Sequence, residues 1–409
     1  MFCGLLLILT SLLLTGCLGE VQLNQRAIVQ AIGIDLGQDG GVELTFQIFA
    51  PAASGIEISA SAENAKIITA SGRTVSEAVQ NATLTQGKEL FIGHNRIVIL
   101  SKELAEQGVE QTLSYFSANA FSRQNVCMMV SEGKAKELLS AKINQGILPA
   151  ETLEKIALNT REAGMLQNIK LFEFLKALEN KHESSMIPVA ALQPDPEGQS
   201  ENGSGEENAQ SGKKGSEGGS SGNSIEQVSS ISLVGMAIFS GGKMVGMLNP
   251  EESRGLMWIR DAVERTSLLV SDDKYEVASL DIFECDSKLI PVIEGKEIDF
   301  ILELELQATI GEALLKEGQT VRMEDIDNLE RVGEELIRKE CLDAFQKAVR
   351  EFQADVFNLG NLVWVKDVQI WTEIREDWPS MLKKIDLEVR PDLKIDRVGL
   401  EFKSDQTPR

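Results

Sequence analysis

The stretch of this chain best suited to chemistry is a short motif near its start, Leu14-Thr15-Gly16-Cys17. A branched apolar residue and two small residues precede a cysteine. Small residues allow the chain to enter the cleft of a signal peptidase, and a thiol after the cleaved bond can form a thioether to diacylglycerol. We interpret the motif as a lipobox and expect Cys17 to be the lipid-bearing first residue of the mature chain. Its two acyl chains would hold the protein stably at a membrane surface.

The apolar run before this motif is too short to cross a bilayer. From Leu5 to Leu14 it would form about 15 Å of helix at ~1.5 Å per residue, against a bilayer core of ~30 Å. We interpret residues 1–16 as a lipoprotein signal peptide that is cleaved. Residues 1–4 contain no Lys or Arg, so we expect the natural start a few residues upstream. The alternative is that Cys17 is an ordinary buried thiol, but its offset from the apolar run favours lipidation.

The acidic composition limits the classes of partner. The chain has 40 Lys and Arg against 63 Asp and Glu, a formal net charge of -23 at pH 7. Proteins that bind nucleic acid need clusters of basic residues, so that class is excluded. The same charge opposes electrostatic adhesion to anionic lipid headgroups. No later stretch approaches 18 uninterrupted apolar residues, and we therefore expect one lipid anchor and no transmembrane helix.

Side chains for catalysis are few. The sequence contains 2 histidines, His94 and His182, which excludes a histidine-rich metal site. A hydrolytic triad would have to use one of them. His94, at the start of a predicted strand, is typical of a turn or hydrogen-bonded structural residue rather than a general base, and His182 should be exposed. Glu303 and Glu305 share one face of a predicted strand, where solvated surface charge is favoured over acid–base work. We predict no enzyme activity and no cofactor.

The remaining cysteines are Cys127, Cys285 and Cys341. An odd number at wide spacing does not form a disulfide framework. Cys127 lies in an apolar predicted strand and Cys341 on the apolar stripe of a predicted helix. We expect both to be buried free thiols.

Strands and helices alternate in the first half of the mature chain, which predicts a mixed α/β domain. A Gly-rich turn joins the first two strands as a hairpin. The predicted strands are 27–35, 42–50, 66–70, 96–100, 126–130 and 186–192. The predicted helices are one beginning after Thr74, then 102–116, 134–139 and a helical stretch over 149–178.

A change of composition divides the chain. Residues 194–226 are almost entirely Ser, Gly, Glu, Asn and other polar residues. Such a segment cannot bury enough apolar area to offset the entropy of ordering it, so it predicts a flexible linker. We expect these units: an N-terminal α/β domain at 17–193, the linker at 194–226, a middle β-rich domain at 227–310 and a C-terminal α/β domain at 311–409.

The second half begins with a hairpin, 232–239 and 243–248, followed by a helix that Asn249 and Pro250 start. Strict alternation from Ile298 to Ile310 predicts a strand with one buried and one acidic face. Later elements are a long amphipathic helix over 323–352, a helix after Val368 that Pro379 interrupts, and strands at 385–389 and 393–402 divided by Pro391. The fold class is α+β, with three domains, mixed and antiparallel sheets flanked by helices, and the long amphipathic helix in the C-terminal domain.

Four stretches occur in order along the chain: the lipobox with AIVQAIGID at 27–35, GHNRIVIL at 93–100, GMAIF at 235–239 continuing to ESRGL at 252–256, and ADVFNLG at 354–360 leading to Trp371. Together they resemble the C-subunit lipoproteins of spore germination receptors, the Ger(x)C family of endospore-forming bacteria. Two features depart from that family. Leu18-Gly19 replaces the usual aromatic and acidic pair, and the linker is longer.

The resemblance implies a three-domain lipoprotein on the outer face of the cell or spore inner membrane, required for the response to nutrient germinants. It implies two protein partners, a partly membrane-embedded A subunit and a permease-like B subunit. It also implies membrane attachment through a diacylglyceryl group on Cys17, and no nucleic acid. No catalytic or ligand-binding residue carries over.

Two other function classes stay open. A solute-binding lipoprotein would capture a nutrient directly between two lobes with parallel sheets, whereas the predicted hairpins favour antiparallel pairing in the second half. An envelope hydrolase would need His94 within hydrogen-bond reach of a serine and a carboxylate.

Overall fold

The structure is a computed structural model that describes residues 26–49, 65–119, 122–141, 149–159, 164–180, 182–194, 229–273, 275–316 and 324–396. The predicted signal peptide, Cys17, the linker beyond Pro194 and the end of the last predicted strand lie outside the described residues.

The first part of the chain forms a sheet whose strands are β1 (Arg26–Leu36), β2 (Val42–Phe49), β3 (Ala65–Gly72), β4 (Glu89–Phe91), β5 (Ile97–Ser101), β6 (Cys127–Ser131), β7 (Ser185–Pro194), β8 (Ser229–Ser240) and β9 (Lys243–Leu248). The strand order is β3-β2-β1-β5-β6-β7-β8-β9, with β4 beside β1. The central strands β1, β5, β6 and β7 are parallel, and antiparallel pairs complete both sides. The predicted strands and the two predicted hairpins of this sheet are confirmed.

Helices cover both faces of the parallel centre. On one face, α5 (Ala135–Ser140) and α6 (Pro149–Asn159) pack on Ile97, Ile99 and Met129. The neighbouring residues Val98, Leu100 and Met128 belong to the core on the other face. That core also contains residues of α2 (Val75–Gln86), α3 (Lys102–Gln107), α4 (Glu110–Ala118) and α7 (Leu171–Glu179). A strand buried on both faces is continuously apolar, as GHNRIVIL predicts.

The helix predicted over 102–116 is wrong in one respect, because it is broken between α3 and α4. Gly108 lies in the break with a φ of 132°, a conformation that glycine adopts readily and L side chains rarely adopt. The amide of Val109 then donates to the carbonyl of Gly242 at 2.9 Å. The break is therefore fixed by a contact with the β8–β9 turn, far away in the sequence. The helical stretch predicted over 149–178 is likewise two helices, α6 and α7.

The second sheet has the order β10-β11-β12-β13. Its strands are β10 (Thr266–Val270), β11 (Tyr275–Glu294), β12 (Glu297–Leu315) and β13 (Leu387–Ile395). The alternation over 298–310 is confirmed in β12, with the apolar side chains from Ile298 to Ala308 buried. Strands β10 and β11 are not predicted from the sequence. The predicted division at Pro391 is wrong, because β13 lies at the edge of the sheet, where proline is tolerated inside a strand.

Helices α8 (Pro250–Ile259) and α9 (Glu324–Phe345) pack against each other and against this sheet. A π-helical turn, η6 (Gln346–Glu351), continues α9, so the two occupy the range predicted for the long helix. Three short helices follow, α10 (Leu359–Lys366), α11 (Val368–Ile374) and α12 (Trp378–Met381). Pro379 stands in the first turn of α12, so the prediction that it interrupts a helix is wrong.

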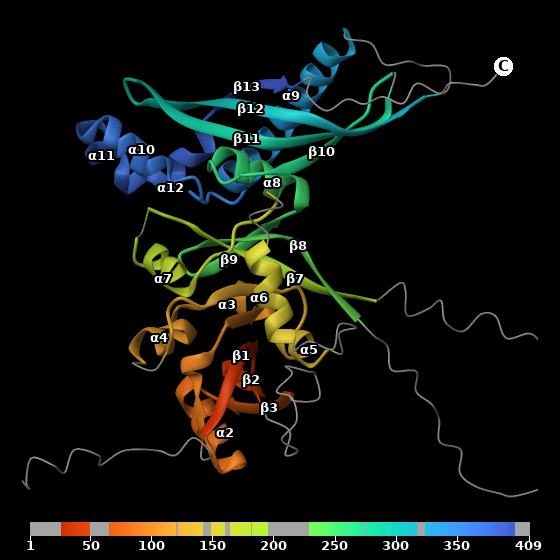
Figure 1. Cartoon of the computed structure of the whole chain (residues 1–409). Helices are drawn as coiled ribbons and strands as arrows, with labels where there is room; N and C mark the ends of the chain where they lie inside the picture. Colours follow the sequence, from red (N-terminus) through yellow and green to blue (C-terminus); the bar gives the residue numbers. More distant parts are fainter. Residues whose placement is uncertain are drawn as a thin grey trace, which may run out of the picture.

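Figure 1 shows the two sheets above one another, with α8 between them and α10 to α12 at one side. One apolar core cluster runs through both, from Phe46 in β2 to Phe300 in β12. Strands β8 and β9, from the predicted middle region 227–310, belong to the first sheet. The fold class is α+β, as predicted, and both sheets are mixed, since β13 pairs with β12 in parallel while β10, β11 and β12 are antiparallel. Among the described residues, no helix is both long enough and apolar enough to cross a bilayer.

Candidate functional site

The end of the first sheet where the described chain begins is the part nearest in sequence to Cys17. Arg26 starts β1 and lies opposite Glu89 of β4, which directly follows α2 and its C-terminal turn. The Lys66 ammonium donates to the Gln86 side chain at 2.6 Å, which places the start of β3 here as well. We call this end the tether end. The side chains of Lys66, Leu84 and Lys88 are exposed on it, whereas Arg26 is half-buried, lies over the Phe91 ring and is paired with Glu89 at 3.8 Å.

His94 lies in a short turn before β5 and is exposed. Its ring contacts Phe91 edge-to-face, with 5.6 Å between ring centroids. Within the described ranges, the imidazole forms no hydrogen bond to a serine or a carboxylate, which is the arrangement that a hydrolase would need. His94 therefore lies in a turn, as its position before a predicted strand indicates.

His182 is half-buried, so the prediction that it is exposed is wrong. Its ring packs edge-to-face on Trp371 of α11, with 5.4 Å between the ring centroids. Its Nδ1 atom is buried and has no hydrogen-bond partner among the described residues. The sequence neighbours Lys181 and Glu183 are charged, which gave no signal of this long-range aromatic contact.

Glu303 and Glu305 lie on the solvent-exposed face of β12, as predicted. Their environments differ across the sheet. Glu303 is aligned with Lys288 on β11 and with Arg390 on β13. Glu305 is aligned with Asp286 and Asp392, so three carboxylates form one row across the strands. No described group of His, Cys, Asp and Glu has the geometry to hold a metal ion.

The motif ESRGL at 252–256 packs α8 against α9. The Glu340 carboxylate of α9 is only 2% exposed and accepts hydrogen bonds from the Arg254 guanidinium and from Trp258 Nε1, the latter at 3.1 Å. A buried carboxylate needs such partners because it has lost its water. This stretch of the family resemblance therefore acts in the packing of two helices.

The motif ADVFNLG at 354–360 builds the start of α10. Asp355 is buried, and its carboxylate accepts from the amides of Leu359 at 2.7 Å and Gly360 at 2.8 Å and from Trp378 Nε1 at 3.1 Å. Burial raises the pKa of Asp355 to about 6, although these three hydrogen bonds act in the opposite direction. The Asp355 carbonyl also accepts from the amide of Ser184, which ties this motif to the segment before β7.

Three aromatic side chains surround that motif. Trp371 contacts both His182 and Trp378, with 5.2 Å between the two indole rings. A Cβ atom at Gly360 would lie 2.7 Å from Trp371, closer than side-chain contacts allow. Only glycine therefore permits the indole to lie against the first turn of α10.

A pocket of about 160 Å³ opens beside this cluster. It lies between the segment after α7 and the helices α10 and α11. Figure 1 shows α10 and α11 as neighbours. None of its lining side chains carries a carboxylate, ammonium or guanidinium group. We call it the tryptophan–asparagine pocket, and its lining residues are Asn180, His182, Asn358, Gly360, Asn361, Trp364 and Trp371.

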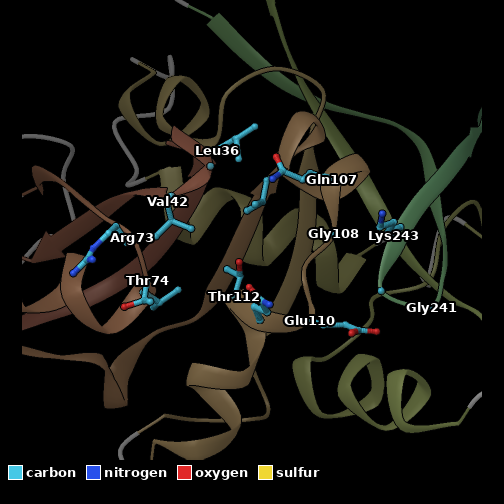
Figure 2. A pocket seen from close by; sticks show the side chains of 16 residues that line it. Leu36, Val42, Arg73, Thr74, Gln107, Gly108, Glu110, Thr112, Gly241 and Lys243 are labelled. Atoms are coloured by element: carbon cyan, nitrogen blue, oxygen red, sulfur yellow. The ribbon is translucent and has the colours of Figure 1, made fainter. Parts of the chain in front are cut away.

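A larger pocket of about 350 Å³ lies where four turns meet, those of β1–β2, β3–α2, α3–α4 and β8–β9 (Figure 2). Arg73 and Thr74 lie on one side of this pocket, and Glu110 and Lys243 lie on the other. Arg73 is paired with Glu77 at 3.2 Å. A ligand here would meet separated charges around the rim instead of one concentrated charge.

The motif at 354–360 and Trp371 belong to the predicted family resemblance, whereas Asn361 and Trp364 do not. A signal was present, because Asn361 and Trp364 are three residues apart on α10, and Asn358 precedes the helix by one residue. Their approach to residues 180–182 is a long-range contact that no local pattern predicts.

Two family models match the chain. The model described as spore germination protein N-terminal domain matches residues 19–192, and the model described as spore germination B3/GerAC like, C-terminal, matches residues 234–399. Together they include both sheets of the structure.

Individual relatives match over nearly their whole length. Spore germination protein KC of Bacillus subtilis (strain 168) is 22% identical over 97% of this chain and 95% of its own. Spore germination protein B3 of the same organism is 20% identical over 95% of each chain. The crystal structure of the GerBC protein is similar with a TM-score of 0.51 and 16% identity, over 89% of this chain and 96% of that one.

Proposed function

This chain belongs to the Ger(x)C family of spore germination proteins, and on that premise we propose that it is the lipid-anchored C subunit of a nutrient germinant receptor. It would act on the outer face of the spore inner membrane, through contact with other proteins. The observation that carries the proposal is the pair of family matches at 19–192 and 234–399, in the order that the relatives share.

The position of the tether end supports attachment through Cys17. At ~3.3–3.6 Å per residue, the segment between Cys17 and Arg26 reaches at most about 30 Å. The tether end therefore stays close to the bilayer if Cys17 carries acyl chains. It presents the exposed ammonium groups of Lys66 and Lys88 in a protein whose net charge is -23, while the Arg26 guanidinium is paired with Glu89. Local positive charge is favourable next to anionic lipid, each Lys or Arg contributing about 1 kcal/mol near the surface.

The protein partners in this proposal are the partly membrane-embedded A subunit and the permease-like B subunit. An acyl anchor would confine the C subunit to the same surface as these partners. Confinement raises the effective concentration of each binding surface for the other, so weak individual contacts suffice for a stable complex. The germination role of the relatives supports this reading.

A Cys17→Ala variant tests the proposal. We expect it in the aqueous fraction of disrupted spores, with loss of the germination response and of co-purifying A and B subunits. Cys285→Ala is the matched control, because it removes a half-buried thiol far from the tether end and should leave all three readouts unchanged. Full germination by a Cys17→Ala protein that is absent from the membrane fraction would refute the anchored role.

A further inference from the structure

We propose that the tryptophan–asparagine pocket binds a neutral, hydroxyl-rich ligand of the size of one monosaccharide ring. This site goes beyond the proposed receptor role, and it does not depend on the lipid anchor. At about 160 Å³ it is smaller than the ~300–1,000 Å³ typical of pockets for drug-sized ligands. A single small ring is the ligand that this space suits.

The polar groups of the pocket favour a neutral ligand with several hydroxyl groups. The side chains of Asn358 and Asn361 form no hydrogen bond within the described part of the chain. Each amide offers two donor hydrogens and one acceptor oxygen, which matches vicinal hydroxyl groups because a hydroxyl both donates and accepts. Asn180, Asn358 and Asn361 are exposed, and no lining side chain carries a carboxylate, ammonium or guanidinium group, so the pocket offers hydrogen bonds but no fixed counter-charge to an ionic ligand.

The aromatic groups favour a ring over an open polar chain. Trp364 is 48% exposed, so about half of its side-chain surface is open to a ligand in the pocket. Trp371 lines the other part of the pocket and is held by its contacts with His182 and Trp378. Indole faces carry negative partial charge, so they attract the C–H groups of a sugar ring while its hydroxyl groups meet the asparagines.

The pocket is already organised by its surroundings. The hydrogen bonds to the Asp355 carboxylate fix the first turn of α10, and Gly360 lets Trp371 lie against that turn. Asn358 holds a left-handed conformation with a φ of 60°, one that asparagine adopts more readily than most residues. Little reordering would then accompany ligand binding, and preorganisation of this kind raises affinity.

The neighbouring pocket strengthens the preference against anions. It has a volume of about 370 Å³ and shares Asn180 and His182 with the tryptophan–asparagine pocket. Its lining adds Glu110, Glu183 and Asp355. A sugar phosphate in the smaller pocket would lie beside these carboxylates and be repelled, whereas an uncharged sugar would not.

The test is a titration of the full-length protein in a detergent without a sugar headgroup. D-glucose, D-galactose and D-ribose are the neutral probes, and D-glucose 6-phosphate and L-alanine are the charged ones. Tryptophan fluorescence and calorimetry are recorded together. We expect saturation with at least one neutral sugar, and no saturation with either charged probe. Because Cys17 plays no part here, Cys17→Ala protein should bind the sugar as well as wild type, which separates this test from that of the anchor.

Two variants locate the site. Trp364→Ala removes the half-exposed indole, and Asn361→Asp introduces a charge with almost no change of size. Each should weaken sugar binding by at least about tenfold, which corresponds to ~1.4 kcal/mol. Phe172→Ala is the matched control, since it removes an exposed aromatic ring from α7 outside the pocket and should leave the affinity unchanged.

The proposal is overturned if none of the three neutral sugars saturates the wild-type protein, or if saturation is unchanged in both pocket variants. It is equally overturned if L-alanine alone saturates the site. Loss of co-purifying receptor subunits in Trp364→Ala, without sugar binding by wild type, would identify the indole as a protein contact instead.

Discussion

The strands of the two sheets are buried in different ways. In the first sheet, helices lie on both faces of a parallel centre, and consecutive residues such as Val98 and Ile99 belong to cores on opposite faces. In the second sheet, β12 alternates between buried leucines and exposed carboxylates, and α9 covers the apolar side. The first sheet therefore has little free surface at its centre, whereas the second exposes a charged face.

Because of this difference, the first sheet can hold other parts of the molecule in place, whereas the second sheet offers an exposed surface. The parallel centre fixes the relative positions of the tether end and the turns around it. The open face of the second sheet and the short helices α10 to α12 present polar and aromatic side chains to solvent, among them Glu303, Glu305 and Trp364. The shared core cluster joins the two parts mechanically, so that a perturbation of either should be felt by both.

The largest expected effect is on that shared core. Phe46 in the first sheet and Phe300 in the second are fully buried. Replacing either with alanine should lower the free energy of unfolding by about 3–5 kcal/mol, because it leaves a cavity in addition to losing apolar contact. Urea unfolding followed by tryptophan fluorescence and circular dichroism should show one transition that both variants shift. Two separate transitions, each sensitive to one variant only, would show that the sheets unfold independently.

A comparable effect is expected at the contact between α8 and α9. Glu340→Ala leaves the Arg254 guanidinium without its buried partner, and breaking a buried pair in this way costs about 3–5 kcal/mol. Glu335→Ala, on the exposed side of the same helix, removes only the surface pair with Arg331 and should change stability by less than about 0.5 kcal/mol. Equal midpoints of urea unfolding for the two variants would contradict this assignment.

Asp355 should make stability depend on pH. Its pKa is about 6 in the folded protein and ~3.9 in the unfolded chain. Between pH 4 and 6 the folded state therefore binds more protons, so the stability due to this group is present at low pH and is lost as the pH rises through 6. At 1.36 kcal/mol per pKa unit, wild type should lose about 2 kcal/mol relative to Asp355→Asn between pH 4 and 6, out of about 3 kcal/mol for the complete titration.

The first sheet offers a comparison for this pH effect. Asp35 is also buried and accepts from the amides of Ala135 and Lys136, and burial raises its pKa too. Asp35→Asn should therefore change the slope of the free energy of unfolding against pH in the same direction as Asp355→Asn. Urea unfolding at several pH values measures both slopes, and parallel stability curves for wild type and Asp355→Asn would be inconsistent with the raised pKa of Asp355.

The smallest effects are expected on the open face of the second sheet. Glu303→Gln removes attraction to Lys288 and Arg390 and should be destabilising, whereas Glu305→Gln removes repulsion from Asp286 and Asp392 and should be stabilising. Cross-strand charge pairs contribute about 0.2–1 kcal/mol each. The two variants form a matched pair in thermal unfolding at low salt. Shifts of the unfolding midpoint in the same direction for both variants would show that the cross-strand alignment of the charges does not determine their effect on stability.

Much of the fold was predictable because local patterns specify it. The apolar run of β5 and the alternation of β12 were each enough to place a strand, and Asn249 with Pro250 placed the start of α8. Strand β11 was missed because shifts of register interrupt its pairing with β12 near Tyr275, Ala278 and Ile282. A strict alternation does not survive such bulges.

Long-range contacts account for the other differences. The break between α3 and α4 depends on Gly242, and the half-burial of His182 depends on Trp371. Likewise β7 pairs with β8, although the predicted linker lies between them. The tryptophan–asparagine pocket brings residues 180–182 to α10 and α11, so its existence could not be predicted from spacing within either segment.

The central claim, a receptor subunit held at the membrane by its first mature residue, is tested most directly by mass spectrometry of the protein's N-terminal peptide from spore membranes. We predict a mature chain that begins at Cys17 and carries a diacylglyceryl group on the sulfur. A protein that retains residues 1–16, with an unmodified thiol at Cys17, would contradict it.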